Sequence, residues 1–270
     1  MIVARYYEVL NLKKSPFSLT PDVSMFYLMR SHVEAVDTVV FAYDNGVPMV
    51  RIYGEPGMGK TMLLRYVQLR MEEERGISPV YVSYHPVMGV RGLLRSLLGD
   101  VPDDLDADTI SRLLKGRLEA GDCVLLIDEA QDLGTEGFLM VKHLLDMGND
   151  GGSAGRLFVV CAGTMKLRRL FETEELEPLS QRAPYHYILR GLTKEELSGY
   201  IDYRLRKAGY SGDFPFSRWA LRLVWKRTRG NPRRVNILAE RALLAALSKG
   251  KRRVGRGEVK EAIRDLPPDV

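Results

Sequence analysis

The stretch GEPGMGKT, residues Gly54 to Thr61, follows the apolar run VRIY and precedes the helix-like sequence LLRYVQLRMEEER. It matches the pattern G-x-x-x-x-G-K-[ST] in the strand–loop–helix context that this motif requires. Glycines let backbone N–H groups turn inward around phosphate oxygens without a clashing Cβ atom, and the following helix adds its positive N-terminal end. The stretch therefore predicts a loop that holds nucleotide phosphates.

Two side chains of this loop have predicted roles of their own. Lys60 is expected to neutralise the β- and γ-phosphates, and the hydroxyl of Thr61 is expected to bind Mg²⁺. The candidate nucleotide-binding residues are the whole loop and the residue after it: Gly54, Glu55, Pro56, Gly57, Met58, Gly59, Lys60, Thr61 and Met62.

A second motif, CVLLIDEAQ, lies about 60 residues further on and ends an apolar run in Asp-Glu. This spacing predicts that Asp128 reaches the metal ion and that Glu129 prepares the attacking water. The run LFVVCAGT ends in Thr164. If its strand inserts between the other two, Thr164 would lie beside the γ-phosphate and help to orient water, or it would cap the next helix.

Two arginines are candidates for stabilising the charge of phosphoryl transfer. Arg182 lies in LSQRAPYHYILRGL, just before the last expected strand, where it could reach the nucleotide of a neighbouring subunit. Arg233 lies in RGNPRRVN, at the start of a helix. Either arginine could instead be a partner in a surface salt bridge.

Short apolar runs alternate with helical patterns, which is typical of a parallel sheet wrapped by helices. Their continuously apolar middles indicate strands buried on both faces. We expect strands at 49–53, 80–84, 123–127, 157–161 and 187–189, and helices near 60–75, 89–98, 106–119, 136–147 and 165–172. Four helical patterns follow, near 193–208, 217–228, 233–248 and 256–265.

This change of pattern predicts an α/β domain over residues 1–190 and an all-α lid over residues 191–270. Ser31 with Glu34, and Thr193 with Glu196, fit the S/T-x-x-E capping box at helix starts. The charge is divided in the same place, because residues 1–189 carry a balance of −6 and residues 190–270 a balance of +11. A basic C-terminal part favours a nucleic acid, a nucleotide or an acidic partner, although a solvated basic face is also possible.

Composition excludes several classes of protein. The 270 residues are 45% hydrophobic and 28% charged, which is typical of a globular protein. No apolar run is long enough to cross a bilayer, and the start MIVARYYEVL lacks a secretory signal pattern. Cys123 and Cys161 fall within apolar runs and are interpreted as core residues rather than a disulfide. We therefore expect a cytoplasmic protein.

Taken together, these segments resemble a AAA+ ATPase of the ExeA/GspA type. The similarity spans nearly the whole chain. It includes YYEVLNLKKSPFSLTPDVSMFYLMRSHVEAV, the phosphate loop, IDEAQ, the QR before the last strand, GNPRRVN and KRRVGRGEVKEAI.

The resemblance implies a P-loop (ASCE) fold with strand order 5-1-4-3-2, a helical lid, and ATP with Mg²⁺ bound between the subunits of a homo-oligomer. It implies that Arg182 is the arginine finger and Arg233 the sensor-2 arginine of the lid. Residues 1–48 are similar to the segment that flanks adenine, which makes Phe17 a candidate contact or an ordinary core residue.

Two departures from the family pattern stand out. Where the family often has an asparagine that restrains the catalytic glutamate, this chain has His85, in YHP. A neutral imidazole could hydrogen-bond Glu129, and its protonation would make that link depend on pH. Relatives that serve secretion continue into a transmembrane segment and a wall-binding domain, whereas this sequence ends at LPPDV. It is interpreted as a fragment or a free-standing ATPase.

Three interpretations of the process that this protein serves stay open. The first is a DNA-binding regulator that marks target DNA for a transposase, as in related AAA+ proteins of the TnsC/TniB type. It is supported by basic residues at near-helical spacing, which have affinity for a phosphate backbone: Arg218, Arg222, Lys226 and Arg229, followed by KGKRR at 249–253. The second is the ATPase part of a secretion or cell-envelope assembly. The third, a nucleotide sensor without hydrolysis, is disfavoured by the intact Lys60 and Glu129.

Overall fold

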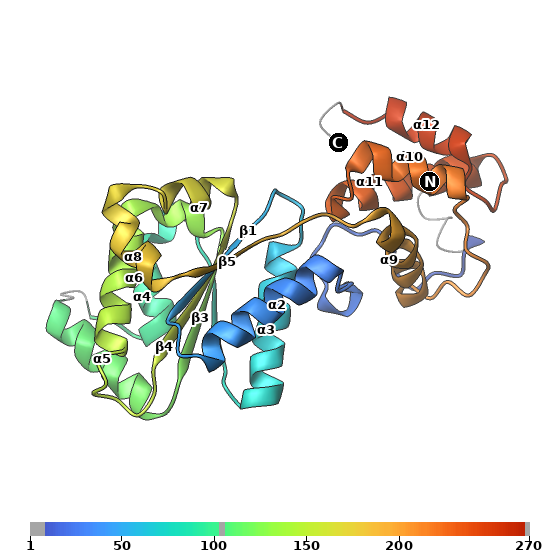
Figure 1. Ribbon diagram of the computed structural model, residues 1–270. Coiled ribbons are helices and arrows are strands. Elements are labelled where there is room, and N and C mark those ends of the chain that lie inside the picture. The colour runs from blue at the N-terminus through green and yellow to red at the C-terminus, as the bar shows by residue number, and fades with distance from the viewer. Residues whose placement is uncertain (1–8, 103–105, 268–270) are drawn as a thin grey trace. The chain divides into compact units, whose positions relative to one another are not determined.

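The computed structural model describes residues 9–102 and 106–267 (Figure 1). The first eight residues, which include the start of the segment that carries the family resemblance, lie outside this part. The chain divides into two compact units. The sheet unit comprises Glu34–Pro56 and Lys60–Leu189, and the helical unit comprises Met1–Val33, Gly57–Gly59 and Arg190–Val270.

A parallel sheet of five strands forms the centre of the sheet unit. Its order is β2-β3-β4-β1-β5, which confirms the expected order 5-1-4-3-2. All four neighbouring pairs run parallel. The strands are β1 (Met49–Tyr53), β2 (Val80–Ser83), β3 (Cys123–Asp128), β4 (Leu157–Gly163) and β5 (Tyr185–Ile188). Because β4 lies between β1 and β3, the residues that end these three strands are brought to one edge of the sheet.

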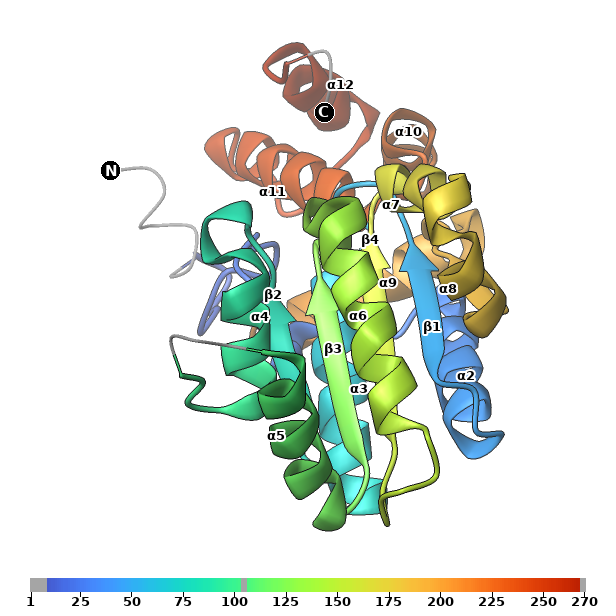
Figure 2. The same ribbon diagram turned by 90° about the vertical axis from the view of Figure 1, so that its left-hand side faces the viewer.

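Helices cover both faces of this sheet. Figure 2 shows α6 on one face and α3 on the other. The helices of the unit are α2 (Arg30–Asp44, which begins in the helical unit), α3 (Lys60–Arg75), α4 (Gly89–Leu98), α5 (Ala107–Glu119), α6 (Gly134–Gly148), α7 (Met165–Leu170) and α8 (Glu177–Arg182). Short 3-10 turns are η2 (Pro86–Met88), η3 (Ala130–Leu133) and η4 (Glu174–Leu176).

Burial explains why the central strands could be identified from sequence. Every residue of β1, β3 and β4 is buried, as the continuous apolar runs indicate. The edge strand β5 differs, because it pairs only with β1 and three of its four residues are exposed. Its sequence YHYI lacks an apolar run, and the strand therefore begins two residues earlier than expected.

The helical unit packs four helices around a core of its own. These are α9 (Lys194–Lys207), α10 (Arg218–Thr228), α11 (Pro232–Ser248) and α12 (Arg256–Arg264), and the 3-10 turn η1 (Val23–Met25) precedes them in the chain. Buried residues of the N-terminal segment, among them Phe17 and Met29, belong to the same core cluster.

A buried arginine ties the N-terminal segment to α9. The guanidinium of Arg204 donates to the carbonyl oxygens of Pro16 (2.5 Å), Ser18 (3.1 Å) and Met25 (3.4 Å). Because buried charges are tolerated only when hydrogen-bonded, these bonds stabilise the segment against α9. The described residues up to Val33 thus group with the C-terminal helices.

The two expected capping boxes have different outcomes. Thr193 and Glu196 form a complete box at the start of α9. At α2 the helix begins at Arg30, one residue before Ser31, so Ser31 is not the cap residue that the sequence predicted. Instead its hydroxyl accepts the backbone N–H of Arg190 (2.8 Å), and Glu34 accepts the hydroxyl of Tyr187 (2.5 Å). The pattern S-x-x-E was wrong here because both side chains bond to a distant segment.

Two sequence expectations about apolar residues can be compared with the structure. Cys123 and Cys161 are buried free thiols, as expected. In the described part of the chain, every helix is too short or too polar to cross a membrane.

Candidate functional site

The phosphate loop joins the end of β1 to the start of α3. Gly57 and Gly59 have φ angles of 84° and 87°, a region that non-glycine residues rarely adopt. The N–H of Gly54 donates to the carbonyl of Gly163 at the end of β4 (3.0 Å). The loop is therefore anchored at Gly54 to the edge of the sheet, and its turn depends on the positive φ angles of Gly57 and Gly59.

Lys60 is a buried cation at the first position of α3. Only 6% of its surface is exposed, and its Nζ donates to the carbonyl of Gly54 (2.9 Å). Burial lowers the pKa of Lys60 from its ordinary value, and the nearby carboxylates of Glu129 and Asp128 act in the opposite direction. A buried ammonium with few partners is well suited to an anionic ligand.

Asp128, the last residue of β3, collects three hydrogen bonds. Its Oδ2 accepts the hydroxyls of Thr61 (2.5 Å) and Tyr81 (3.0 Å), and its Oδ1 accepts the backbone N–H of Glu129 (2.9 Å). Burial, with the charge of Asp128 nearby, raises the pKa of Tyr81 to about 12, so its hydroxyl stays a donor. Thr61 and Asp128 are thus brought together as the sequence predicted, and Tyr81 is an addition to the predicted set.

This pair of oxygens fits a magnesium ion. Mg²⁺ is usually held by one or two protein oxygens together with substrate phosphates and water, rather than by a complete protein cage. The Thr61 and Asp128 side chains supply such oxygens within 2.5 Å of each other. The described residues contain no cluster of three or more His, Cys, Asp or Glu that could hold a metal.

Glu129 follows Asp128 in an unusual backbone conformation, with φ 50° and ψ 38°. Its Oε2 accepts the Nε2 amide of Gln131 (2.9 Å). The Oε1 atom of Gln131 in turn accepts the backbone N–H of Thr164 (3.0 Å), and the Thr164 hydroxyl accepts the N–H of Lys166 (3.3 Å) as the cap of α7. Thr164 therefore caps a helix and also lies in the network around Glu129.

His85 has a different hydrogen bond from the expected one. Its Nδ1 accepts the backbone N–H of Val87 (3.3 Å) as the cap of the short helix η2. The side chain that bonds the Glu129 carboxylate is Gln131. The link from His85 to Glu129 that the sequence left possible is therefore not the bond seen here, where the imidazole is used in a local turn.

Arg182 ends α8 and is half exposed. Its guanidinium forms an ion pair with Asp146 of α6, which also pairs with Lys142 (3.2 Å). The buried Arg51 of β1 anchors the same segment, donating to the carbonyl of Ala183 (2.6 Å) and the hydroxyl of Ser180 (3.1 Å). Arg182 thus projects from a segment that is fixed to the sheet, with a partner on its own chain.

Within the helical unit, the middle of the phosphate loop contacts two segments. The backbone N–H of Arg233 donates to the carbonyl of Gly57 (3.3 Å), and a Cβ on Gly57 would lie 2.6 Å from the Cβ of Arg233. The ring of His32 bonds the carbonyl of Met58 through Nε2 (2.9 Å). Burial lowers the pKa of His32, so a neutral ring is favoured.

Phe17 is completely buried and meets Phe216 edge to face, with 6.5 Å between ring centroids. Its ring is therefore part of the core of the helical unit. Contact of Phe17 with a nucleotide stays a prediction, and it would require this packing to open.

Comparison with known proteins agrees with this geometry. Residues 45–171, which hold the phosphate loop, Asp128, Glu129 and Thr164, match the family model described as AAA domain. This segment is therefore similar to AAA domains. AAA domains are P-loop nucleotide-binding modules, and the loop, the buried lysine and the acidic strand end resemble the site of such a module.

The chain is 29% identical over 270 residues to general secretion pathway protein A from Aeromonas hydrophila, with 97% of this chain and 48% of that protein covered. It thus spans about half the length of that relative.

Solved structures show the same fold. ORC2 from Aeropyrum pernix is 16% identical, with a TM-score of 0.67 over 94% of this chain and 71% of that one. Cdc6p from Pyrobaculum aerophilum is 18% identical, with a TM-score of 0.69 over 93% and 70% of the two chains.

Sequence reasoning missed three side chains of the site: Tyr81, Gln131 and His32. Tyr81 lies 47 residues from its partner Asp128, and His32 lies 26 residues from Met58. Gln131 was quoted within IDEAQ, but its contact with Thr164 spans 33 residues. The sequence signal that could have identified Gln131 was its position two residues after the candidate base, Glu129.

Proposed function

We propose that the chain binds ATP with Mg²⁺ and hydrolyses it, acting as an oligomeric, nucleotide-dependent switch. The observation that carries this proposal is the convergence of Lys60, Thr61 and Asp128 on the phosphate loop, with Glu129 next to them in the chain. The AAA domain match supports it.

Each residue of the site has a chemical role in this proposal. Lys60 and the loop amides bind the phosphates, and Thr61 and Asp128 would hold Mg²⁺, which when bound neutralises phosphate charge. Glu129 orients a water molecule and accepts its proton at a carboxylate oxygen. Thr164 lies in the network around that carboxylate and helps to order it.

The proposal is tested by titrating the purified chain with ATP in the presence and absence of Mg²⁺ and by measuring phosphate release. We expect magnesium-dependent binding below millimolar ATP and steady turnover. Absence of binding at millimolar ATP would overturn the proposal. Binding without phosphate release would indicate a nucleotide sensor without hydrolysis.

Arg182 is proposed to act as an arginine finger on the nucleotide of a neighbouring subunit. It is half exposed on a segment anchored by Arg51, so it can reach outward without loss of the local fold. Its partner Asp146 would be exchanged for the phosphates of the neighbour. Because arginines left facing one another repel, assembly would then depend on bound nucleotide.

Replacement of Arg182 by Ala is expected to lower turnover on the order of 10³-fold, which is typical for loss of an arginine finger. The affinity for ATP should stay within about threefold, because the loop that binds the phosphates is unchanged. Phosphate release and ATP titration measure the two effects. Arg168→Ala is the matched control, since Arg168 is a similarly exposed arginine paired with Glu172.

Mixing two inactive variants tests whether the finger acts between subunits. The Arg182→Ala variant keeps Glu129, and a Glu129→Gln variant keeps Arg182. A mixed interface can therefore combine an intact base with an intact finger, and turnover should reappear. If Arg182 acts on the nucleotide of its own chain, the mixture stays inactive.

Arg233 is proposed as the lid arginine that responds to the γ-phosphate. Its support is the hydrogen bond of its backbone N–H to Gly57 in the middle of the phosphate loop. The N-terminal segment before Glu34, with His32 and Phe17, is proposed to flank adenine.

A role in secretion or cell-envelope assembly is one candidate output of the switch. It is supported by the similarity to general secretion pathway protein A, which extends over 97% of this chain. In this role the protein would act in the cytoplasm and transmit nucleotide state to envelope proteins.

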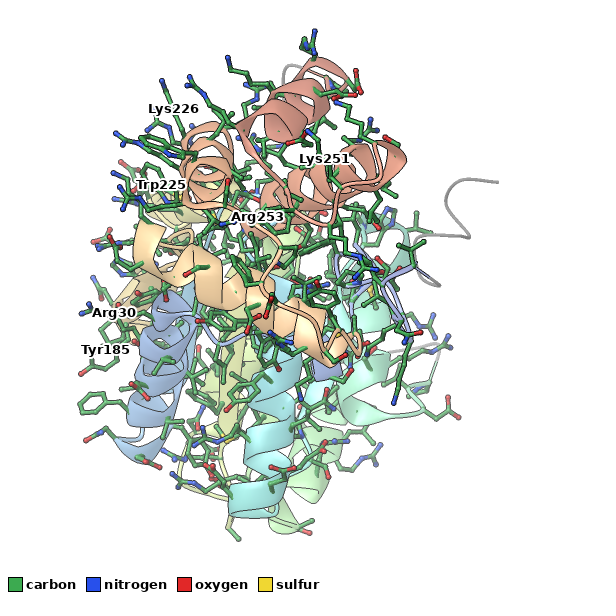
Figure 3. All side chains as sticks on the ribbon, turned by 90° about the vertical axis from the view of Figure 1, so that its right-hand side faces the viewer. Arg30, Tyr185, Trp225, Lys226, Lys251 and Arg253 are labelled. Carbon is green, nitrogen blue, oxygen red and sulfur yellow. The ribbon has the colours of Figure 1, made fainter. Side chains whose placement is uncertain are left out.

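Binding of double-stranded DNA, in cooperation with a transposase, is the second candidate. Helix α10 carries exposed Arg218, Arg222 and Lys226 at four-residue intervals and has no acidic residue. Lys226 extends outward from α10, and Lys251 and Arg253 lie in the basic segment between α11 and α12 (Figure 3). Such a row supplies affinity for a phosphate backbone without sequence specificity.

Reversing charges on α10 tests this second candidate. With a slowly hydrolysed ATP analogue at low salt, we expect duplex DNA to be retained, and the double variant Arg222→Glu/Lys226→Glu to bind about tenfold more weakly or less. The control is Arg95→Glu/Arg112→Glu, which makes the same change of charge at exposed sites of the sheet unit. Equal loss in both variants, or indifference of the unmodified chain to DNA in every nucleotide state, would eliminate the candidate.

A further inference from the structure

The amide of Gln131 joins two groups of the site. Its Nε2 donates to Oε2 of Glu129 over 2.9 Å, and its Oε1 accepts the backbone N–H of Thr164 over 3.0 Å. Glu129 follows the end of β3 and Thr164 follows the end of β4. One side chain thus connects the proposed base to the neighbouring strand.

The bond to Thr164 decides which way this amide faces. A backbone N–H can only donate, so the atom of Gln131 that faces it must be the oxygen. The NH₂ group then points to the other side, where it meets the acceptor-only carboxylate of Glu129. A reversed amide would lose both bonds, so the chemistry of the two partners fixes the orientation.

Space for the amide depends on Gly163, the last residue of β4. A Cβ at this position would lie 2.7 Å from Oε1 of Gln131 and 2.8 Å from the side chain of Leu167. The carbonyl of Gly163 accepts the N–H of Gly54, where the phosphate loop begins (3.0 Å). The same turn of chain therefore contacts the start of the phosphate loop and gives room to Gln131.

The backbone at Glu129 makes side-chain support important. Glu129 has a left-handed conformation and precedes the 3-10 helix η3, to which its side chain gives no capping bond. Its backbone N–H is held by Asp128. Among the described residues, Gln131 is the side chain that hydrogen-bonds its carboxylate, while His85 caps η2 instead.

We propose that Gln131 is a positioning residue for hydrolysis, which orients the Glu129 carboxylate and ties that orientation to the backbone of Thr164. The inference rests on the proposed function, because it gives the base of that same site its partner. An ionised carboxylate accepts a stronger hydrogen bond than a neutral acid. The bond is therefore strongest in the state of Glu129 that is ready to take a proton.

Gln131→Met tests this role, because methionine has a similar length and lacks both hydrogen-bonding atoms of the amide. We expect kcat to fall about 10- to 100-fold, as is usual when a catalytic group is misplaced by a small distance. KM, the equilibrium affinity for ATP and the melting temperature should stay near those of the unmodified chain. A purely structural residue would change the last two.

A double variant then shows whether Gln131 acts through Glu129. In the Glu129→Gln background the carboxylate is already gone, so adding Gln131→Met should lower the residual turnover no further. If the two losses multiply, Gln131 acts independently of Glu129, and the proposal is overturned.

Gln68→Met is the matched control, since Gln68 lies on α3, where its Oε1 accepts from Arg65 (3.1 Å) and its Nε2 makes longer bonds of 3.4 and 3.5 Å. It should hydrolyse ATP normally. Normal kcat in Gln131→Met, beside an active unmodified chain, overturns the positioning role alone. An unmodified chain that releases no phosphate overturns the proposed function and this inference together.

Discussion

Replacing Glu129 by Gln is expected to lower ATP turnover by about 10²- to 10⁴-fold, the usual contribution of a general base. Glutamine keeps the shape of the side chain and can still accept the Gln131 bond, but it cannot take a proton from water. The site around it, including the contact of Thr61 with Asp128, is unchanged. ATP affinity should therefore stay within about threefold.

The same variant should accumulate with ATP bound. If assembly requires ATP between subunits, the variant will sediment as a larger species with ATP than with ADP. The unmodified chain will change from the larger species to the smaller one as it consumes ATP. Glu136→Gln, at an exposed position in the first turn of α6, serves as the control. Turnover unaffected by Glu129→Gln would show that another group activates the water.

The sheet and the nucleotide motifs were predictable because their determinants are local. Strands β1, β3 and β4 are buried on both faces, so each appears as an apolar run. The loop Gly54–Thr61 carries its glycines, lysine and hydroxyl in eight consecutive residues, and its conformation favours glycine at Gly57 and Gly59.

The parts that sequence could not supply depend on contacts between distant residues. Ser31 had the pattern of a helix cap, yet a segment near Arg190 takes its hydroxyl. His85 had the position of a glutamate partner, yet a local turn uses its ring. Gln131 takes the place of His85 only because β4 lies beside β3 and brings the N–H of Thr164 within reach. Such contacts depend on the order of the strands in the sheet, and this order cannot be read from any single stretch of sequence.

Removing the charge of Lys60 is expected to have the second large effect. In Lys60→Met the side chain keeps its length, but the buried ammonium that is proposed to bind the phosphates is lost. A hydrogen bond to a charged group contributes about 1.5–3 kcal/mol, so ATP affinity should fall about 10- to 100-fold or more. Turnover should be lost as well, because Lys60 would stabilise the charge that develops during transfer.

The pH dependence of ATP binding provides an independent check of this role. Burial lowers the pKa of Lys60, so its ammonium loses a proton at a lower pH than a lysine in water. If binding needs the charged form, ATP affinity should decline on the alkaline side before exposed lysines lose their protons. In Lys60→Met this part of the decline should be absent, while in the control Lys142→Met, an ion-paired lysine on α6, it should persist. Equal alkaline declines in all three proteins would mean that the charge of Lys60 does not bind the phosphates.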